Sequence, residues 1–359
     1  MKSEAGRVKS ENEGRVAACF GASERQGGGQ LFMNTRPFGK TGRNVGEIGL
    51  GTWQIGGGWG EVTDAAALAT LRAAHAAGVT FFDTADVYGG GRSESLIGQF
   101  LREIPAARGE VFVATKLGRN NWPNGFTREQ VRGFTEASLK RLGVDALDLT
   151  QLHCIPTEVL KRGEMLGWLE ELKREGKIKA YGASVESMDE ALFCVEQGGC
   201  TSLQIIFNIF RQKPIHTLFA AALAKQVALI VRLPLASGLL GGKLSRGTTF
   251  AADDHRLFNR DGQRFNVGET FAGLPFERGL ELADELKARV PAGVSMAAWA
   301  LRWCLDFEAV TVVIPGARNA EQVAGNVAAA GLAPLDVETH AKLAAFYERE
   351  VAAYIRGPY

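Results

Sequence analysis

The chain has 359 residues, a mass of 38.6 kDa and a formal net charge of +1, from 41 basic and 40 acidic residues. Hydrophobic residues make up 46% and charged residues 23%, which is an ordinary globular composition. The near-zero charge offers no electrostatic footprint for nucleic acid or an anionic membrane. The mean hydropathy is −0.04, and no apolar run approaches the length of about 18 residues that a membrane-spanning helix needs.

The cysteines are scattered and odd in number: Cys19, Cys154, Cys194, Cys200 and Cys304. No pair has the C-x-x-C spacing, so we expect neither a zinc ribbon nor a disulfide framework. The five histidines also lack metal-ligand spacing, and no metal site is expected. Reduced thiols in a cytoplasmic protein fit this usage best.

The first segment of the chain, residues 1–33, is polar and rich in glycine. It has no apolar stretch of the kind that a secretory signal needs, and its mixed charges argue against an organelle transit peptide. We interpret it as a disordered tail or as the product of a mis-assigned upstream start codon. Residues 34–359 are then expected to form one domain.

From Val45 onward, short apolar runs of strand length alternate with helical patterns. The predicted strands end near Gly51, Asp83, Lys116, His153, Ser184, Phe207, Leu233 and Ile314. The predicted helices cover 64–77, 127–142, 164–175, 187–197, 214–225, 276–289, 295–305 and 319–328. Runs such as Ile205-Ile206-Phe207 are apolar throughout, which is typical of parallel strands buried on both faces. Eight such units predict a closed (β/α)₈ TIM barrel, with a doubly wound open sheet as the alternative.

One connection is unusually long. Residues 236–275 show no clear helical period and are rich in Gly, Asp, Asn and Arg. The connection follows the carboxyl end of a predicted strand, the face on which barrel enzymes build their sites. We therefore expect it to fold over a bound ligand rather than to be a disordered insertion.

Four polar residues stand at or just beyond the ends of consecutive predicted strands: Asp83, Tyr88, Lys116 and His153. Taken singly, each has a structural explanation, as a helix cap, a rim aromatic, a solvated strand end or a core histidine. In a closed barrel, however, these positions converge on one rim. A charged residue at the end of an apolar strand is also costly unless it is paired.

Such a set suits the protonation of an oxygen that becomes an alkoxide as a hydride arrives. The ordinary pKa of a tyrosine is about 10, and the neighbouring Lys116 is expected to lower the pKa of Tyr88. We expect Asp83 to hold Lys116 by an ion pair. His153 is expected to donate a hydrogen bond to a substrate carbonyl oxygen.

At these residues the chain resembles the aldo-keto reductase superfamily, from about Arg36 to the C-terminal region. The family consists of (β/α)₈ barrels that reduce carbonyl compounds with NADPH and carry an Asp–Tyr–Lys–His tetrad. Gly-Leu-Gly-Thr-Trp at 49–53 resembles its first-strand motif. The string at 232–243, with its Arg-x-Pro-Leu-Ala-Ser-Gly motif, resembles a bacterial branch.

The resemblance implies NADPH as cofactor, with NADH as the alternative. The residues that it places at the cofactor are Gly51, Thr52, Trp53, Asp83, Ser184, Gln204, Arg232, Pro234, Leu235, Ser237, Lys243, Gly316, Arg318, Gln322 and Asn326. Ser184 and Gln204 match carboxamide ligands, whereas Val185 stands where the family has Asn. Arg232 replaces an aromatic residue that stacks on the nicotinamide, a role that a guanidinium plane can also perform.

The string at 314–326 resembles the adenosine-phosphate site of the family, with the phosphates at a helix N-terminus. Arg318 is expected to hold a 2′-phosphate. Some branches have Lys where Gly316 stands, which leaves the choice between NADPH and NADH open.

The resemblance implies the reduction of a small-molecule aldehyde or ketone to an alcohol, with Tyr88 as proton donor. The substrate is expected to meet Trp53, Tyr88, Trp122 and His153, with residues 354–359 reaching the same pocket. One alternative is a nicotinamide-binding, redox-sensing regulatory subunit with little turnover, as the potassium-channel β subunits of the family are. Another is a phosphosugar isomerase or lyase, which would bind no nicotinamide. The physiological substrate and the oligomeric state stay open.

Overall fold

The computed structural model describes residues 33–122 and 125–359, so all of the proposed tail at 1–33 except Met33 lies outside the described residues. The chain folds as a (β/α)₈ barrel, as predicted. Its parallel strands pair in chain order: β3 (Leu50–Gly51), β4 (Phe81–Asp83), β5 (Phe112–Leu117), β6 (Leu149–His153), β7 (Tyr181–Ser184), β8 (Ser202–Ile206), β9 (Ala228–Arg232) and β10 (Val310–Val313). The first and last strands close the barrel, because Ile48 bridges to Val313 and Gly51 bridges to Gly316.

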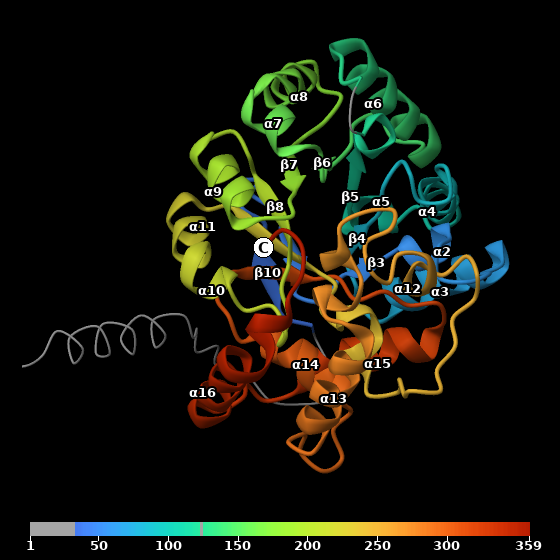
Figure 1. Ribbon diagram of the computed structural model, residues 1–359. Coiled ribbons are helices and arrows are strands. Elements are labelled where there is room, and N and C mark those ends of the chain that lie inside the picture. The colour runs from blue at the N-terminus through green and yellow to red at the C-terminus, as the bar shows by residue number, and fades with distance from the viewer. Residues whose placement is uncertain (1–32, 123–124) are drawn as a thin grey trace, which may run out of the picture.

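Helices surround these strands, with α6 and α8 on one side of the barrel and α14 and α15 on the opposite side (Figure 1). The helices are α2 (Trp53–Gly56), α3 (Asp64–Ala76), α4 (Arg92–Glu103), α5 (Ala107–Glu110), α6 (Arg128–Leu142), α7 (Thr157–Lys161), α8 (Glu164–Arg174), α9 (Met188–Glu196), α10 (Pro214–Thr217), α11 (Phe219–Lys225), α12 (His255–Phe258), α13 (Phe276–Lys287), α14 (Met296–Leu305), α15 (Ala320–Gly331) and α16 (Val337–Phe346). None of the described helices is long and apolar enough to cross a membrane.

Local signals explain several helix boundaries. At the start of α6, Thr127 and Gln130 form a reciprocal capping box, and α6 ends at Gly143 with a positive φ of 66°. The single helix predicted over 214–225 is two helices, because Leu218 takes a φ of −114° between α10 and α11. The helix α16 lies beyond the last predicted element.

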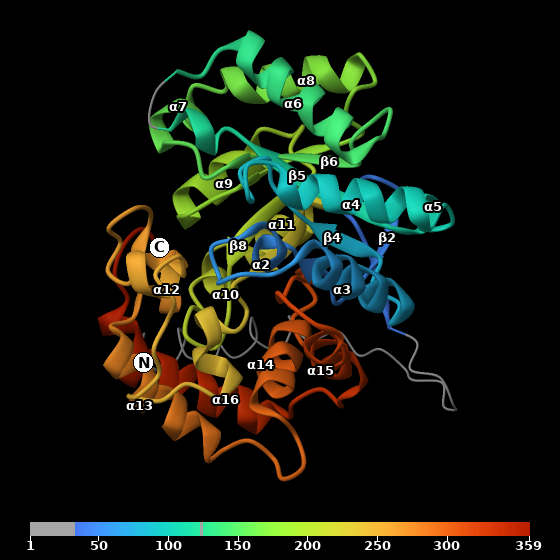
Figure 2. The same cartoon turned by 90° about the vertical axis from the view of Figure 1, so that its right-hand side faces the viewer.

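The amino-terminal face of the barrel carries an antiparallel hairpin that the sequence did not reveal, formed by β1 (Thr35–Pro37) and β2 (Asn44–Gly46). In its connection, the fully buried ring of Phe38 packs 5.5 Å from Phe81 and 4.7 Å from Phe112, measured between ring centroids. Phe38 thereby joins the buried cluster inside the barrel. In Figure 2, β2 and α12 lie at opposite ends of the barrel. The hairpin therefore closes the face opposite the long connection.

The long connection, residues 236–275, is ordered by short helical turns rather than structureless. It contains 3₁₀ turns at Ala236–Gly241, Val267–Glu269 and Phe271–Gly273, together with α12. The buried Asn259 side chain accepts hydrogen bonds from the N–H groups of Arg264 and Phe265 and donates one to Thr270. These turns are too short to produce a helical period in the sequence, which is why they were not predicted.

Candidate active site

A cavity of about 680 Å³ opens at the carboxyl ends of the strands, between the long connection and the start of α15. Sixteen of the predicted site residues line it: Gly51, Trp53, Asp83, Tyr88, His153, Ser184, Gln204, Arg232, Pro234, Leu235, Ser237, Lys243, Gly316, Arg318, Gln322 and Asn326. Residues from seven strand ends and loops, far apart in sequence, are thus brought to one site.

Three predicted residues lie outside the cavity wall. Lys116 is fully buried directly behind Tyr88. The Thr52 hydroxyl points into the protein, where it donates to the carbonyl of Asp83. Trp122 is 57% exposed and does not line the cavity.

The predicted tetrad is assembled around the ammonium group of Lys116. Its Nζ lies 2.7 Å from Asp83 Oδ2, 2.8 Å from the carbonyl oxygen of Thr84 and 3.2 Å from the hydroxyl of Tyr88. The other oxygen of Asp83 accepts a hydrogen bond of 2.7 Å from Gln204. Every proton of the ammonium group therefore has an acceptor, which is what allows a buried lysine to stay charged.

The electrostatics of Tyr88 differ from the expectation in one respect. Burial raises the pKa of Tyr88 above its ordinary value, and the opposing effect of Lys116 does not overcome it. The expected lowering is therefore wrong, because the phenol is fully desolvated. Burial also works against the charge of Lys116, but Asp83 and Tyr88 outweigh it, and the pKa of Lys116 is raised. Because the ammonium donates to the phenol oxygen, the Tyr88 proton is left to donate into the cavity.

The imidazole of His153 packs edge-on against Tyr88, with ring centroids 5.8 Å apart. Burial, together with nearby cations including Arg119, lowers the pKa of His153 well below its ordinary value. The ring is therefore neutral at physiological pH. Its Nε2 atom lies 3.4 Å from Nη1 of Arg119. Its Nδ1 atom is buried and has no hydrogen-bond partner among the described residues.

Beside His153 lies an ionic cluster that the sequence did not reveal. Glu269, from the long connection, makes a two-pronged ion pair with Arg119, at 3.0 and 3.3 Å, and lies 3.5 Å from Arg232. Burial would raise the pKa of Glu269, but the two arginines outweigh it and lower the pKa to about 2. Burial and the neighbouring Glu269 raise the pKa of Glu186 to about 7. Arg119 and Glu269 are 150 residues apart, so no local pattern links them.

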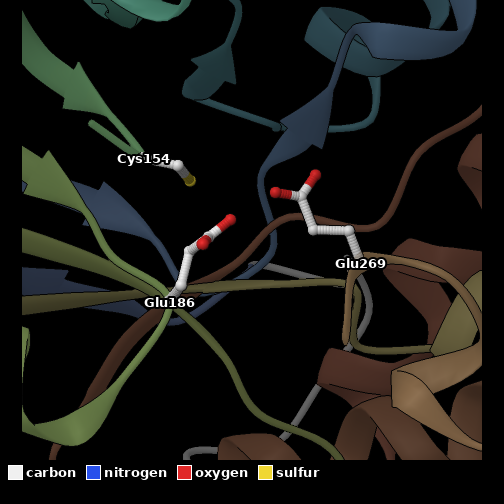
Figure 3. A group of neighbouring side chains, drawn as sticks. All are labelled: Cys154, Glu186 and Glu269. Atoms are coloured by element: carbon white, nitrogen blue, oxygen red, sulfur yellow. The ribbon is translucent and has the colours of Figure 1, made fainter. Parts of the chain in front are cut away.

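Glu186 and Glu269 converge with the thiol of Cys154, as Figure 3 shows. Their ligand atoms lie within 4.8 Å of one another, a spacing that could hold a metal ion. Arg232 contacts Cys154 at 3.5 Å and Arg119 pairs with Glu269, however, so two guanidinium groups already supply the positive charge. Burial also raises the pKa of the Cys154 thiol to about 11, which keeps it protonated. The cluster is therefore better described as an ion-pair network than as a metal centre.

Two glycines line the cavity where β3 meets the segment after β10, and both are tightly packed. A Cβ added to Gly51 would lie 3.0 Å from the carbonyl oxygen of Ile314, and one added to Gly316 would lie 2.0 Å from the Gln54 amide. At the same edge, Asn319 caps α15 by accepting a hydrogen bond from the Gln322 N–H. Free N–H groups at a helix start suit a phosphate. This arrangement fits the dinucleotide expected from the sequence.

Aromatic rings form the opposite wall. Trp53 stacks nearly parallel on Tyr88, with centroids 6.0 Å apart, and meets Trp59 edge-on at 5.7 Å. The buried His255 packs 4.7 Å from Trp53, and burial lowers its pKa to about 4. Phe265 completes this wall from the long connection. Residues of the long connection thus join Trp53, a predicted substrate residue, in one aromatic wall.

The C-terminal residues do not reach the cavity, contrary to the expectation. None of residues 354–359 lines it. The guanidinium of Arg211 instead lies 4.0 Å from the ring centroid of Tyr359, and Arg356 Nε donates to the carbonyl of Gly273 at 2.9 Å. The tail therefore braces the long connection from behind.

The barrel fold and the cavity at its carboxyl end are those of NAD(P)H-dependent oxidoreductases, and sequence comparison identifies the family. The sequence profile of the aldo/keto reductase family matches residues 47–348. The chain belongs to the aldo/keto reductase family.

Among the relatives of this chain, the aldo-keto reductase YhdN of Bacillus subtilis is 32% identical, over 79% of this chain and 84% of that protein. The NADH-specific methylglyoxal reductase of Escherichia coli is 30% identical, over 83% of this chain and 93% of its own length. A probable voltage-gated potassium channel subunit beta of Arabidopsis thaliana is 29% identical, over 84% and 93%. Similarity therefore extends both to reductases and to a channel subunit.

Solved structures show the same fold. The glycerol dehydrogenase of Gluconobacter oxydans matches with a TM-score of 0.72 and 28% identity, over 90% of this chain and 98% of that one. An aldo/keto reductase of Klebsiella pneumoniae, solved with NADP and acetate, matches with a TM-score of 0.63 and 25% identity, over 88% and 96%.

Proposed function

We propose that this protein reduces a small aldehyde or ketone to an alcohol with NADPH, NADH being the alternative cofactor. The observation that carries the proposal is the buried ammonium of Lys116. It donates to the oxygen of Tyr88 while Asp83 holds it in place. A neutral phenol whose oxygen already accepts a hydrogen bond from a cation can release its proton to a developing alkoxide.

The bound cofactor would supply the hydride. The residues of the chain perform the remaining work: Tyr88 transfers its proton to the carbonyl oxygen, so that a C–H and an O–H bond form together. Lys116 then stabilises the tyrosinate until it regains a proton from solvent. Trp53 and the aromatic wall exclude water from the reacting centre.

Several residues of the cavity wall support a nicotinamide cofactor. Ser184, Gln204 and Arg232 line the inner end of the cavity, and the Nε atom of Arg232 is buried without a partner among the described residues. Such an orphaned donor fits a site that is completed by a ligand. Arg318 stands at the outer end, beside the start of α15, where it could pair with a 2′-phosphate.

The decisive experiment measures the loss of NADPH absorbance over a panel of aldehydes, ketones and sugars, with Tyr88→Phe beside the wild type. We expect turnover in the wild type and its loss in Tyr88→Phe, with NADPH binding retained in both. Tight NADPH binding without turnover on any compound would instead favour a redox-sensing subunit. Absence of NADPH binding would contradict both functions.

A further inference from the structure

A second cavity, of about 290 Å³, lies at the end of the barrel opposite the candidate active site. Its buried lining residues include Phe112, the first residue of β5, and Ala180, which directly precedes β7. The connection of the β1–β2 hairpin forms one side of it, and the loop between α9 and β8 forms another. It shares no lining residue with the cavity at the carboxyl ends of the strands, so it is a separate site.

Basic side chains dominate the wall of this second cavity. Lys40 and Arg43 come from the hairpin connection, Lys173 from α8, and Lys179 from the segment before β7. Asp148 is the one carboxylate that lines it. The whole chain has a net charge of only +1, so this concentration of positive charge is local. A cavity lined by charges of one sign attracts and concentrates ions of the opposite sign.

The single carboxylate is already engaged by two other partners. Asp148 accepts a hydrogen bond of 2.8 Å from the Lys179 ammonium at one oxygen and one of 3.1 Å from the Val113 N–H at the other. Its side chain is only 15% exposed. Asp148 therefore holds Lys179 at the cavity and leaves the other basic groups of the wall without a carboxylate.

The remaining cations are oriented by uncharged groups. Arg43 donates to the carbonyl of Gly109 at 3.3 Å, and its guanidinium carbon lies 5.9 Å from the ring centroid of Phe112. The Lys173 ammonium lies 5.8 Å from the ring centroid of Tyr181. Neither of these two basic residues, nor Lys40, makes an ion pair with a carboxylate in the part of the chain that the structure describes. Their charge is therefore available to a bound anion.

Basic groups on the neighbouring surface between α6 and α8 are paired instead. Arg128 lies 2.7 Å from Glu171, and Lys177 lies 2.9 Å from Glu136. The lack of carboxylates around the second cavity is thus a feature of that cavity and not of this side of the molecule.

The backbone that carries two of the cations is fixed before any ligand arrives. The Phe38 N–H donates to the Arg43 carbonyl at 2.8 Å, and the Thr41 hydroxyl donates to the Phe38 carbonyl at 2.7 Å. Gly39 has a φ of 51°, and a Cβ there would lie 2.6 Å from the carbonyl oxygen of Thr201. The hairpin connection is therefore seated closely on the loop before β8, which reduces the entropy lost when an anion binds.

We propose that this second cavity binds a small anion with two or more negative charges, a phosphorylated compound about the size of diphosphate. Guanidinium and ammonium groups form strong, charge-assisted hydrogen bonds with phosphate oxygens. The volume of about 290 Å³ is at the lower end for ligand pockets and suits a small anion rather than a nucleotide. Because binding would favour the folded state, the anion should stabilise the protein. The inference is independent of the proposed function. The alternative is that these cations form an ordinary solvated face.

The test is calorimetric titration of inorganic diphosphate into protein saturated with NADPH, which occupies the other cavity. We expect binding at one site. Lys40→Gln and Lys173→Gln should each weaken it about tenfold, because each removes one charge-assisted contact. Glycerol 3-phosphate, titrated in the same way, distinguishes a phosphate ester from inorganic diphosphate. The two variants locate the bound anion, so the titration still decides the proposal if the protein binds no NADPH.

Two further variants serve as controls. Lys140→Gln removes an exposed lysine of α6 that lines neither cavity and should keep the wild-type affinity. Lys173→Arg keeps the charge and should bind within about threefold of the wild type. As a second readout, diphosphate should raise the Tm of the wild type but not that of the double variant Lys40→Gln/Lys173→Gln, with kcat unchanged in both.

Three results would overturn the proposal. The first is that neither diphosphate nor glycerol 3-phosphate binds. The second is an unchanged affinity in the double variant, which would place the anion elsewhere. The third is an equal loss of affinity in Lys140→Gln, because that result describes a general attraction of anions to the surface.

Discussion

At the scale of single residues, the site depends on one buried charge. Lys116 is fully buried and satisfied by Asp83, Thr84 and Tyr88. Replacing one member of a buried ion pair leaves the other charge desolvated, and that cost differs from the loss of catalysis. The two effects can therefore be measured apart.

We expect Lys116→Met to abolish measurable turnover and to lower the free energy of unfolding by about 3 to 5 kcal/mol, because Asp83 is left unpaired. The double variant Lys116→Met/Asp83→Asn should recover part of that stability but none of the activity. Chemical denaturation and the reductase assay measure the two quantities. Equal stability of the single and double variants would contradict this account.

The raised pKa of Tyr88 predicts how the rate depends on pH. Tyr88 donates its proton only while it is neutral, so reduction slows as pH rises through its pKa. The pKa of Tyr88 lies above the ordinary value of about 10. Ionisation of Tyr88 should therefore not lower kcat between neutral pH and about pH 10. The pH profile of kcat measures this, and a fall in kcat between neutral pH and about pH 10 that follows the ionisation of Tyr88 would contradict the account.

At the scale of elements, the start of α15 and the long connection divide the cavity between them. The backbone N–H of Arg318 donates to the Gln322 side chain, and its guanidinium donates to the carbonyl of Trp59. The long connection supplies Glu269 and Phe265. Both elements therefore line the cavity in which we propose that the dinucleotide and the substrate bind.

We expect Arg318→Ala to raise the Kd for NADPH about tenfold while leaving the Kd for NADH unchanged within about twofold, because only NADPH carries the 2′-phosphate. Titration of the intrinsic tryptophan fluorescence with each cofactor measures both constants. As a control, Arg289→Ala removes an arginine of the loop after α13 that pairs with Glu285 away from the cavity. Equal weakening of both cofactors in Arg318→Ala would place the 2′-phosphate elsewhere.

At the scale of the whole molecule, the two ends of the barrel have different tasks. The carboxyl ends of the strands carry the site, and the hairpin with Phe38 closes the other end. In barrel enzymes the amino-terminal face contributes stability rather than chemistry. Changes at that end should therefore affect folding alone.

We expect Phe38→Ala to lower the free energy of unfolding by about 3 to 5 kcal/mol, because it empties a fully buried aromatic position. The KM for any substrate should stay unchanged. Leu223→Ala, at a position that is 38% exposed on α11, is the matched control and should cost less than about 1 kcal/mol. Thermal unfolding and steady-state kinetics measure these effects, and an altered KM in Phe38→Ala would contradict the division between the two ends.

Local sequence patterns alone predicted most of the strands and helices of this protein. Continuous apolar runs ending in Asp83, Lys116 and His153 predicted the strands and the barrel, because burial on both faces is visible in the sequence. The tetrad was implied by the family resemblance at these residues. The helix predicted over 127–142 likewise matches α6, which the structure shows beginning after Thr127 and ending at Gly143. Features that depend on residues close together in the chain are the ones that can be predicted from the sequence.

Only the tertiary structure decided the rest. The ion pair of Arg119 with Glu269, the closure of the barrel by Phe38 and the position of the C-terminal tail each join segments far apart in the chain. The direction of the Tyr88 pKa shift also needed the fold, because it is set by desolvation, and burial depends on every surrounding element. Pairing and desolvation are properties of the packed molecule, and no periodicity in the chain encodes them.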